Sequence, residues 1–183
     1  MSIERLERQL VHTGSRLQLF QDRVRLENGL ERRWEVLEQP EVVVVLPFEV
    51  TAEGMRLLLV RQYRYAIGQD LLEFPAGTVE AGEAPEATAR RELAEETGYA
   101  ASRWIALPPV FRMPGTSNER TYFFVATQLT AASGYSADPE EAIALVWLAA
   151  AEFEERIRSG AIEDGKSLIL WLLAQPHLPL IPR

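Results

Sequence analysis

The sequence has no cysteine and only two histidines, which excludes several kinds of site. Without cysteine there is no disulfide and no thiolate-bound metal. His12 and His177 lie near opposite ends of the chain, so neither a histidine-centred triad nor a histidine-rich metal site is expected. Chemistry that depends on thiolates or on clustered imidazoles is therefore not expected.

Long apolar runs are also missing. The longest, Ala142–Ala151, is about half the length that a membrane-spanning helix needs. The first ten residues mix charges of both signs and lack the apolar core of a signal peptide. We therefore expect a cytoplasmic protein with no membrane partner.

Positive charge is in deficit, because the net charge is −8 and no basic cluster offsets it. This balance argues against nucleic acid as the main partner. An acidic protein can hold an anionic substrate only through local cations, either metal ions or a few well-placed arginines. The 183 residues, 47% of them hydrophobic and 25% charged, are otherwise typical of a globular domain with a substantial core.

The apolar pattern predicts strands and helices in an irregular order. An alternating segment at 16–26, the turn dipeptide Asn28-Gly29 and a returning strand at 32–38 make residues 1–40 a β-rich N-terminal section. For residues 41–183 we expect strands near 42–48, 55–65, 71–74, 104–107, 122–128 and 144–148, and helices at 85–97, 149–159 and 165–174. Pro85 suits a first helical turn, and Gly98 suits a helix end. Because strands and helices do not alternate regularly, we expect an α+β fold or a sandwich of helices around a mixed sheet.

Glutamates gather on the predicted helix at 85–97. Glu92 and Glu96 are four residues apart and Glu95 is three from Glu92, so the three carboxylates crowd onto neighbouring faces of one turn. Oxygen-rich clusters of this kind suit hard cations such as Mg²⁺ or Mn²⁺, which link carboxylates to substrate phosphates. Arg91 can orient a carboxylate through a bidentate pair. Taken alone, an acidic triplet more often forms a solvated helix face.

The surrounding string decides between these interpretations. The chain has Gly77, then five residues, Glu83, seven residues, Arg91-Glu92, an aliphatic, any residue, Glu95-Glu96, any residue and Gly98. This string resembles the Nudix box in all its fixed identities, and a chance match is on the order of one in a million at usual residue frequencies. Tyr99 departs from the pattern only at a final aliphatic packing position. The resemblance implies a Nudix-type α/β/α sandwich, and the alternative is a catalytically inactive Nudix-like domain.

The flanking residues resemble the ADP-ribose pyrophosphatase branch of this superfamily. They are the segments Val60–Tyr65 and Leu72–Gly77, and Pro114 sixteen residues after Gly98. This resemblance implies metal-dependent hydrolysis of a nucleoside-diphosphate sugar, with ADP-ribose giving AMP and ribose 5-phosphate. The alternatives are another such sugar, for example GDP-mannose, or a non-catalytic nucleotide-binding protein on the same fold.

The same resemblance implies roles for individual residues. The metal ligands, for Mg²⁺ or Mn²⁺, are Glu92, Glu96 and the backbone carbonyl of Ala76, with Glu95 close by. A loop glutamate, Glu141 or its rival Glu140, is the metal ligand or general base. An ordinary acidic loop is the competing interpretation for both.

Substrate-binding residues are also implied. Arg64 and Arg33 resemble the family's substrate-binding arginines, although both could be surface residues. Trp34, Phe20 or Tyr65 could stack on an adenine base or belong to the core. Glu119 is a further candidate, either for a substrate contact or for a position near the metal ions. Because the family often exchanges N-terminal sections between subunits, a homodimer is expected.

Overall fold

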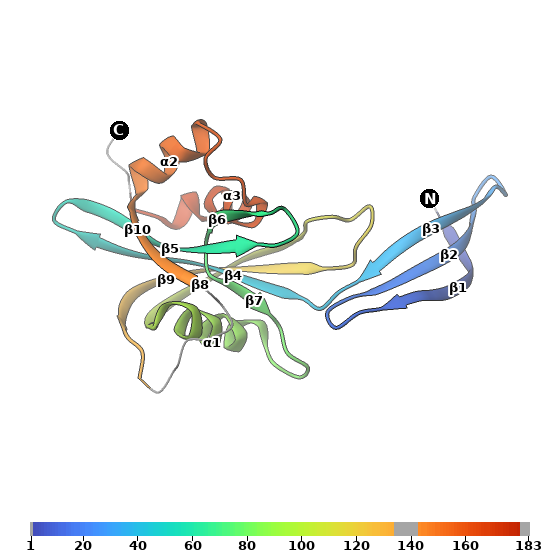
Figure 1. Cartoon of the computed structure of the whole chain (residues 1–183), viewed down its shortest axis with the longest axis horizontal. Helices are drawn as coiled ribbons and strands as arrows, with labels where there is room; N and C mark the ends of the chain where they lie inside the picture. The colour runs from blue at the N-terminus through green and yellow to red at the C-terminus, as the bar shows by residue number, and fades with distance from the viewer. Residues whose placement is uncertain (1, 134–142, 180–183) are drawn as a thin grey trace. The chain divides into compact units, whose positions relative to one another are not determined.

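The computed structural model describes residues 2–133 and 143–179, and the chain forms two compact units (Figure 1). One unit holds residues 1–41 and 110–121, and the other holds residues 42–109 and 122–183. Whether residues 1–40 and 41–183 are separate domains, as the sequence suggested, stays a prediction.

The first unit is built on an antiparallel sheet in the order β1 (Ile3–Thr13), β2 (Gln18–Leu26), β3 (Glu31–Glu38). Gly29 in the β2–β3 turn has a φ of 80°, a left-handed conformation that favours glycine. The Asn28 side chain accepts a hydrogen bond from the backbone N–H two residues on, at 3.1 Å. The hairpin predicted from this dipeptide is confirmed, and β1 adds a strand that the sequence did not indicate separately.

The second unit contains a seven-stranded sheet. Five of its strands follow the order β10-β5-β4-β9-β8, while β6 pairs with β5 and β7 pairs with β4. The strands are β4 (Val42–Thr51), β5 (Gly54–Arg64), β6 (Gln69–Glu73), β7 (Ala76–Thr78), β8 (Tyr99–Phe111), β9 (Arg120–Ala131) and β10 (Ile143–Ala149).

One edge of β5 is shared between two partners. Residues 54–57 pair with β4, and residues 60–64 pair with β6. The first residues of β4, 42–44, pair instead with β7. The chain that links β6 to β7 therefore crosses from the edge of β5 to the edge of β4, where the direct pairing of these two strands has ended. This crossing leads directly into Gly77.

Helices cover both faces of the sheet in the second unit. Helix α1 (Pro85–Thr97) contacts β4 and β7 on one face, and α2 (Ala150–Arg158) and α3 (Gly165–Ala174) lie on the other (Figure 1). A single 3₁₀ turn, Gln175–His177, follows α3. The predicted α+β class, with a sheet sandwiched between helices, is confirmed.

The buried β4 strand explains why both faces need a cover. Val43 and Val45 pack with Leu93 of α1 in one cluster, and all three are fully buried. Val44 and Leu46 are equally buried, and strand alternation directs them to the opposite face. Burying each such side chain stabilises the fold by roughly 1.5–3 kcal/mol. A continuous apolar run therefore specifies a central strand with helices on both sides.

The sequence predicted most elements, but several predicted strands are shorter than the observed ones. The predicted strand at 104–107 is the middle of β8, which begins directly after Gly98. Gly98 ends α1 as predicted, with a φ of 71° and an N–H that donates to the Ala94 carbonyl at 2.9 Å. The three-residue strand β7 was not predicted. Within the described ranges, no helix has the length and apolar character to cross a membrane.

Candidate active site

Gly77, the first residue of the box, lies against the side chain of Glu92. A Cβ atom on Gly77 would stand 1.9 Å from the Glu92 Cδ atom and 2.0 and 2.4 Å from its two carboxylate oxygens. No residue other than glycine fits here while Glu92 keeps this position. The predicted ligand carboxylate is thus seated directly on the backbone of β7.

Ala76 presents its backbone to the box helix. Its N–H donates to the Oε2 atom of Glu96 at 3.0 Å. In the antiparallel pairing of β4 with β7, Ala76 lies opposite Val44. At the neighbouring position, the Val45 N–H donates a hydrogen bond to the Pro75 carbonyl at 2.9 Å. Because alternate residues of an antiparallel strand bond to the partner strand, the N–H and C=O of Ala76 both point away from β4. The carbonyl predicted to bind metal therefore lies on the same side as Glu96.

Arg91 links three carboxylates of the box. Its Nε and Nη2 atoms donate to both oxygens of Glu83 at 3.3 and 3.2 Å. Its Nη1 atom donates to Glu92 and to Glu95, each at 2.8 Å. A further bond, from Nη2 to the Thr78 carbonyl, spans 3.3 Å. The sequence predicted one bidentate pair, and the structure shows that this pair is with Glu83, while Glu92 and Glu95 share the remaining amino group.

The charges in this cluster stabilise one another. Burial lowers the pKa of Arg91, but its hydrogen bonds to Glu83 and Glu95 outweigh burial and raise the pKa overall. The hydrogen bond from Arg91 lowers the pKa of Glu83. Both groups therefore stay charged at neutral pH, and the loop that carries Glu83 is tied to α1.

The donor set of the box fits a hard cation. Glu92 and Glu95 are joined through Arg91, and Glu96 lies on the Ala76 backbone. Among the residues that the structure describes, no three acidic or histidine side chains converge closely enough to form a metal site by themselves. A site made of the Glu92 and Glu96 carboxylates and the Ala76 carbonyl needs only two side chains, and all its donors are oxygens. These oxygen donors suit a metal ion, and the assignment of Ala76, Glu92, Glu95 and Glu96 to a metal site stays a prediction.

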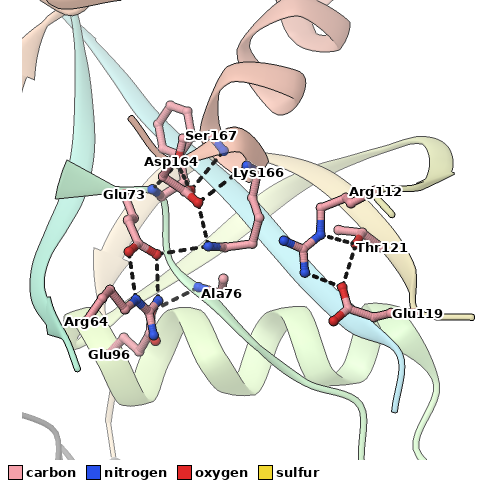
Figure 2. Close-up of polar contacts among 11 residues, drawn as sticks. Arg64, Glu73, Ala76, Glu96, Arg112, Glu119, Thr121, Asp164, Lys166 and Ser167 are labelled. Atoms are coloured by element: carbon pink, nitrogen blue, oxygen red, sulfur yellow. Dashed lines mark hydrogen bonds and ion pairs between the residues drawn. The ribbon is translucent and has the colours of Figure 1, made fainter. Parts of the chain in front are cut away.

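Arg64 belongs to a polar network that sequence reasoning missed (Figure 2). Its Nε and Nη2 atoms donate to the two oxygens of Glu73 at 2.7 and 2.5 Å. The Glu73 side chain is 1% exposed, whereas that of Arg64 is 38% exposed. Hydrogen bonding to Glu73 raises the pKa of Arg64, and the charges of Asp164 and Glu96 add to the rise. Arg64 thus lies within electrostatic reach of the box while remaining accessible to solvent.

The first turn of α3 completes this network. The Lys166 ammonium donates to Glu73 at 3.0 Å and to Asp164 at 2.6 Å. Asp164 caps the helix by accepting from the Ser167 N–H at 3.0 Å, and the Ser167 hydroxyl accepts from the Phe74 N–H at 2.8 Å. A glutamate within an apolar strand and an Asp-Gly-Lys-Ser helix start were the only sequence signals. Neither reveals that the two segments meet.

The remaining predicted substrate residues from the N-terminal section lie on β2 and β3. Arg33 donates to the Gln21 side chain at 3.3 Å, and its neighbour Trp34 is 42% exposed. Phe20 lies under the guanidinium of Arg8, 4.6 Å from ring centroid to Cζ. Their roles toward a substrate stay predictions. Tyr65, in the second unit, is 91% exposed and is not part of the core.

Glu119 has a protein partner that the sequence did not suggest. Arg112 and the Thr121 hydroxyl both donate to its carboxylate (Figure 2). The Glu119 side chain is only 12% exposed. Its role as a substrate contact stays a prediction, and Arg112 is an added candidate for holding it. Glu140 and Glu141, the candidate general bases, lie at 134–142, outside the described residues.

Comparison with known proteins identifies a domain family that matches most of this chain. The NUDIX domain family matches residues 39–171. An ADP-ribose pyrophosphatase of Mycobacterium tuberculosis is 35% identical over 164 residues, covering 88% of this chain and 78% of the relative. A Bacillus subtilis protein of the same name is 35% identical over 125 residues, covering 68% of this chain and 66%, just under two thirds, of the relative.

A solved structure described as an ADP compounds hydrolase shares the fold. Its TM-score is 0.84 at 22% identity, over 97% of this chain and 95% of that one. The resemblance drawn from the box and its flanking residues is confirmed by the sequence relatives. Since the family match spans most of the sequence, this chain belongs to the NUDIX domain family.

Proposed function

We propose that this protein hydrolyses the diphosphate linkage of a nucleoside-diphosphate sugar, with ADP-ribose as the preferred substrate and AMP and ribose 5-phosphate as products. The observation that carries the proposal is the seating of Glu92 on Gly77 and of Glu96 on the Ala76 N–H, within a complete Nudix box. The names of the two relatives, both ADP-ribose pyrophosphatases, support the choice of substrate.

The box residues would hold the metal that this chemistry needs. We assign Glu92, Glu96 and the Ala76 carbonyl as ligands, with Glu95 close by. When bound, Mg²⁺ or Mn²⁺ would neutralise the diphosphate, lower the pKa of a water and stabilise the charge that develops during hydrolysis. Arg91 restrains Glu92 and Glu95 through its Nη1 atom, so these carboxylates are oriented before any ligand arrives.

Other residues bind the substrate and move the proton. Arg64 offers its Nη1 amino group to a phosphate, since its Nε and Nη2 atoms are bonded to Glu73. We assign Arg33, Trp34 and Glu119 to the nucleoside and sugar parts. A loop glutamate, Glu141 or Glu140, takes the proton of the attacking water. The expected homodimer and cytoplasmic location belong to this proposal as well.

Two other functions are distinguished by one assay. A panel of ADP-ribose, GDP-mannose, ADP-glucose, UDP-glucose and NADH is incubated with Mg²⁺ or Mn²⁺, and the products are quantified. We expect AMP from ADP-ribose well ahead of the rest. A preference for another compound would keep the diphosphate chemistry and discard the substrate. Binding of nucleotide without turnover would point to a non-catalytic binding protein.

A further inference from the structure

Lys166 is the only lysine in the sequence, beside 18 arginines. Its side chain is 12% exposed and its ammonium lies between two buried carboxylates, Glu73 and Asp164, which are 1% and 7% exposed. A compact ammonium can serve two acceptors in a narrow space, whereas a planar guanidinium needs a fork of acceptors. The one position that uses lysine is thus a buried position where a single ammonium contacts two carboxylates.

Asp164 holds this ammonium in place. One of its oxygens accepts from the Ser167 N–H at 3.0 Å and from the Ser167 hydroxyl at 2.7 Å, and the other accepts from Lys166. These bonds cap α3, so Asp164 is tied to the helix backbone. Hydrogen bonds of this kind fix the orientation of a side chain. The ammonium is therefore anchored to a rigid element.

Lys166 and Arg64 share a single carboxylate. The Oε2 atom of Glu73 accepts from Lys166 at 3.0 Å and from the Arg64 Nη2 atom at 2.5 Å, while Oε1 accepts from the Arg64 Nε atom. Figure 2 shows the chain of contacts from α3 through Glu73 to Arg64. Two cations and two carboxylates balance in this cluster, in which both carboxylates are buried and Arg64 remains accessible to solvent. The orientation of Arg64 thus depends on a carboxylate that α3 fixes.

We propose that Lys166 is a positioning residue that, by fixing the Glu73 carboxylate, holds the Arg64 guanidinium with its Nη1 amino group ready for a phosphate of the substrate. The inference rests on the proposed function, because it needs Arg64 to bind a diphosphate. It adds a role for the first turn of α3, which no box residue and no predicted site residue occupies.

Loss of Lys166 has a defined consequence. Glu73 would keep Arg64 as its only cation, and its Oε2 atom would lose one of two donors. The Glu73 side chain could then turn, and Arg64 would turn with it. Since Arg64 is assigned to substrate binding, most of the loss should appear in KM and little of it in kcat.

The test is a double-mutant cycle with ADP-ribose and Mg²⁺. We expect Lys166→Met to lower kcat/KM about tenfold, as is usual for residues that orient a ligand-binding group. Arg64→Met should lower it about a hundredfold. The double variant should match Arg64→Met within about threefold, because Lys166 acts through Arg64. Independent, multiplying losses would overturn the proposal. Arg156→Met, which removes a cation from an exposed pair with Glu152 on α2, is the matched control and should keep wild-type kinetics.

A charge-balanced variant separates the expected effect on KM from a folding defect caused by an unpaired buried charge. Asp164→Asn combined with Lys166→Met removes one carboxylate and one cation together, and asparagine still caps a helix. We expect this variant to fold and still to show the raised KM. If it folds and has a wild-type KM, the proposal is wrong.

A single lysine also permits a direct readout in the wild-type protein. Biosynthetic labelling with ¹³C-lysine yields signals from Lys166 alone. The non-hydrolysable α,β-methylene analogue of ADP-ribose, added with Mg²⁺, should shift these signals in the wild type and not in Arg64→Met at equal occupancy. No shift at saturation in the wild type would refute the inference. Failure of the proposed function would instead appear as no turnover of ADP-ribose or any related sugar by the wild type.

Discussion

Replacing Gly77 by alanine tests the central contact of the proposed site. A Cβ atom at this position would stand 1.9 Å from the Glu92 Cδ atom. Two carbons in contact need about 3.5 Å, so the carboxyl group would have to retreat by roughly 1.6 Å. The colliding group is the end of a flexible side chain, so Glu92 should turn away while the backbone stays in place.

The substitution should cost little stability but much catalytic activity. A side chain forced off its preferred rotamer costs about 0.5–1.5 kcal/mol. The melting temperature should therefore fall by no more than about 5 °C. Displacing a catalytic ligand by more than about 1 Å costs on the order of a hundredfold in rate, or about 2.7 kcal/mol. Gly77→Ala should thus be a folded and nearly inactive protein.

The assay is AMP formation from ADP-ribose over a range of Mg²⁺ concentrations, together with thermal unfolding. Gly165→Ala is the control, because a Cβ atom there would meet nothing within 4 Å. It should keep wild-type turnover. The reasoning is refuted if Gly77→Ala keeps kcat/KM within about threefold of the wild type. A large loss of stability would refute it as well, because the collision would then be absorbed by the backbone.

Three further predictions follow from other contacts. Glu96→Gln should cut turnover by orders of magnitude with an unchanged melting temperature, and near-wild-type turnover would rule out Glu96 as a metal ligand. Phe153→Ala should lower the free energy of unfolding, measured by urea denaturation, by about 3–5 kcal/mol. The centroid of the buried Phe153 ring lies 5.2 Å from that of Phe74 and 5.1 Å from that of Trp171, so its loss leaves a cavity between them. A loss under about 1 kcal/mol would contradict this packing. Burial raises the pKa of Asp164, but the charge and hydrogen bond of Lys166 outweigh burial and lower the pKa overall. Its stabilisation should therefore be complete above about pH 4 and be lost as the pH falls through the lowered folded pKa. Wild type and Asp164→Asn should accordingly differ in urea stability at pH 7 and converge near pH 2, and a constant difference would contradict this.

Much of the fold and the box followed from the sequence because the deciding interactions are local. Pro85 and Gly98 mark the ends of α1 through backbone geometry that each residue carries with it. The spacing of Arg91, Glu92 and Glu95 puts their side chains on neighbouring faces of one turn, so their contacts could be anticipated without tertiary structure. The apolar run from residue 42 likewise indicated a strand, and residues 43–48 of that strand are buried.

Only the tertiary structure decided which distant residues meet. Glu73 and Lys166 are 93 residues apart, and so are Phe74 and Ser167. A glutamate in a strand looks the same in sequence whether it faces solvent or a buried lysine, because the difference lies in the path of another segment. The sequence alone indicated the cluster of charged side chains on the box helix, because the contacts of Arg91 with Glu92 and Glu95 lie within one or two helical turns. The fold determined which carboxylate accepts hydrogen bonds from Arg64 and which backbone N–H donates to Glu96. Strand pairing and helix packing set those positions across the whole unit.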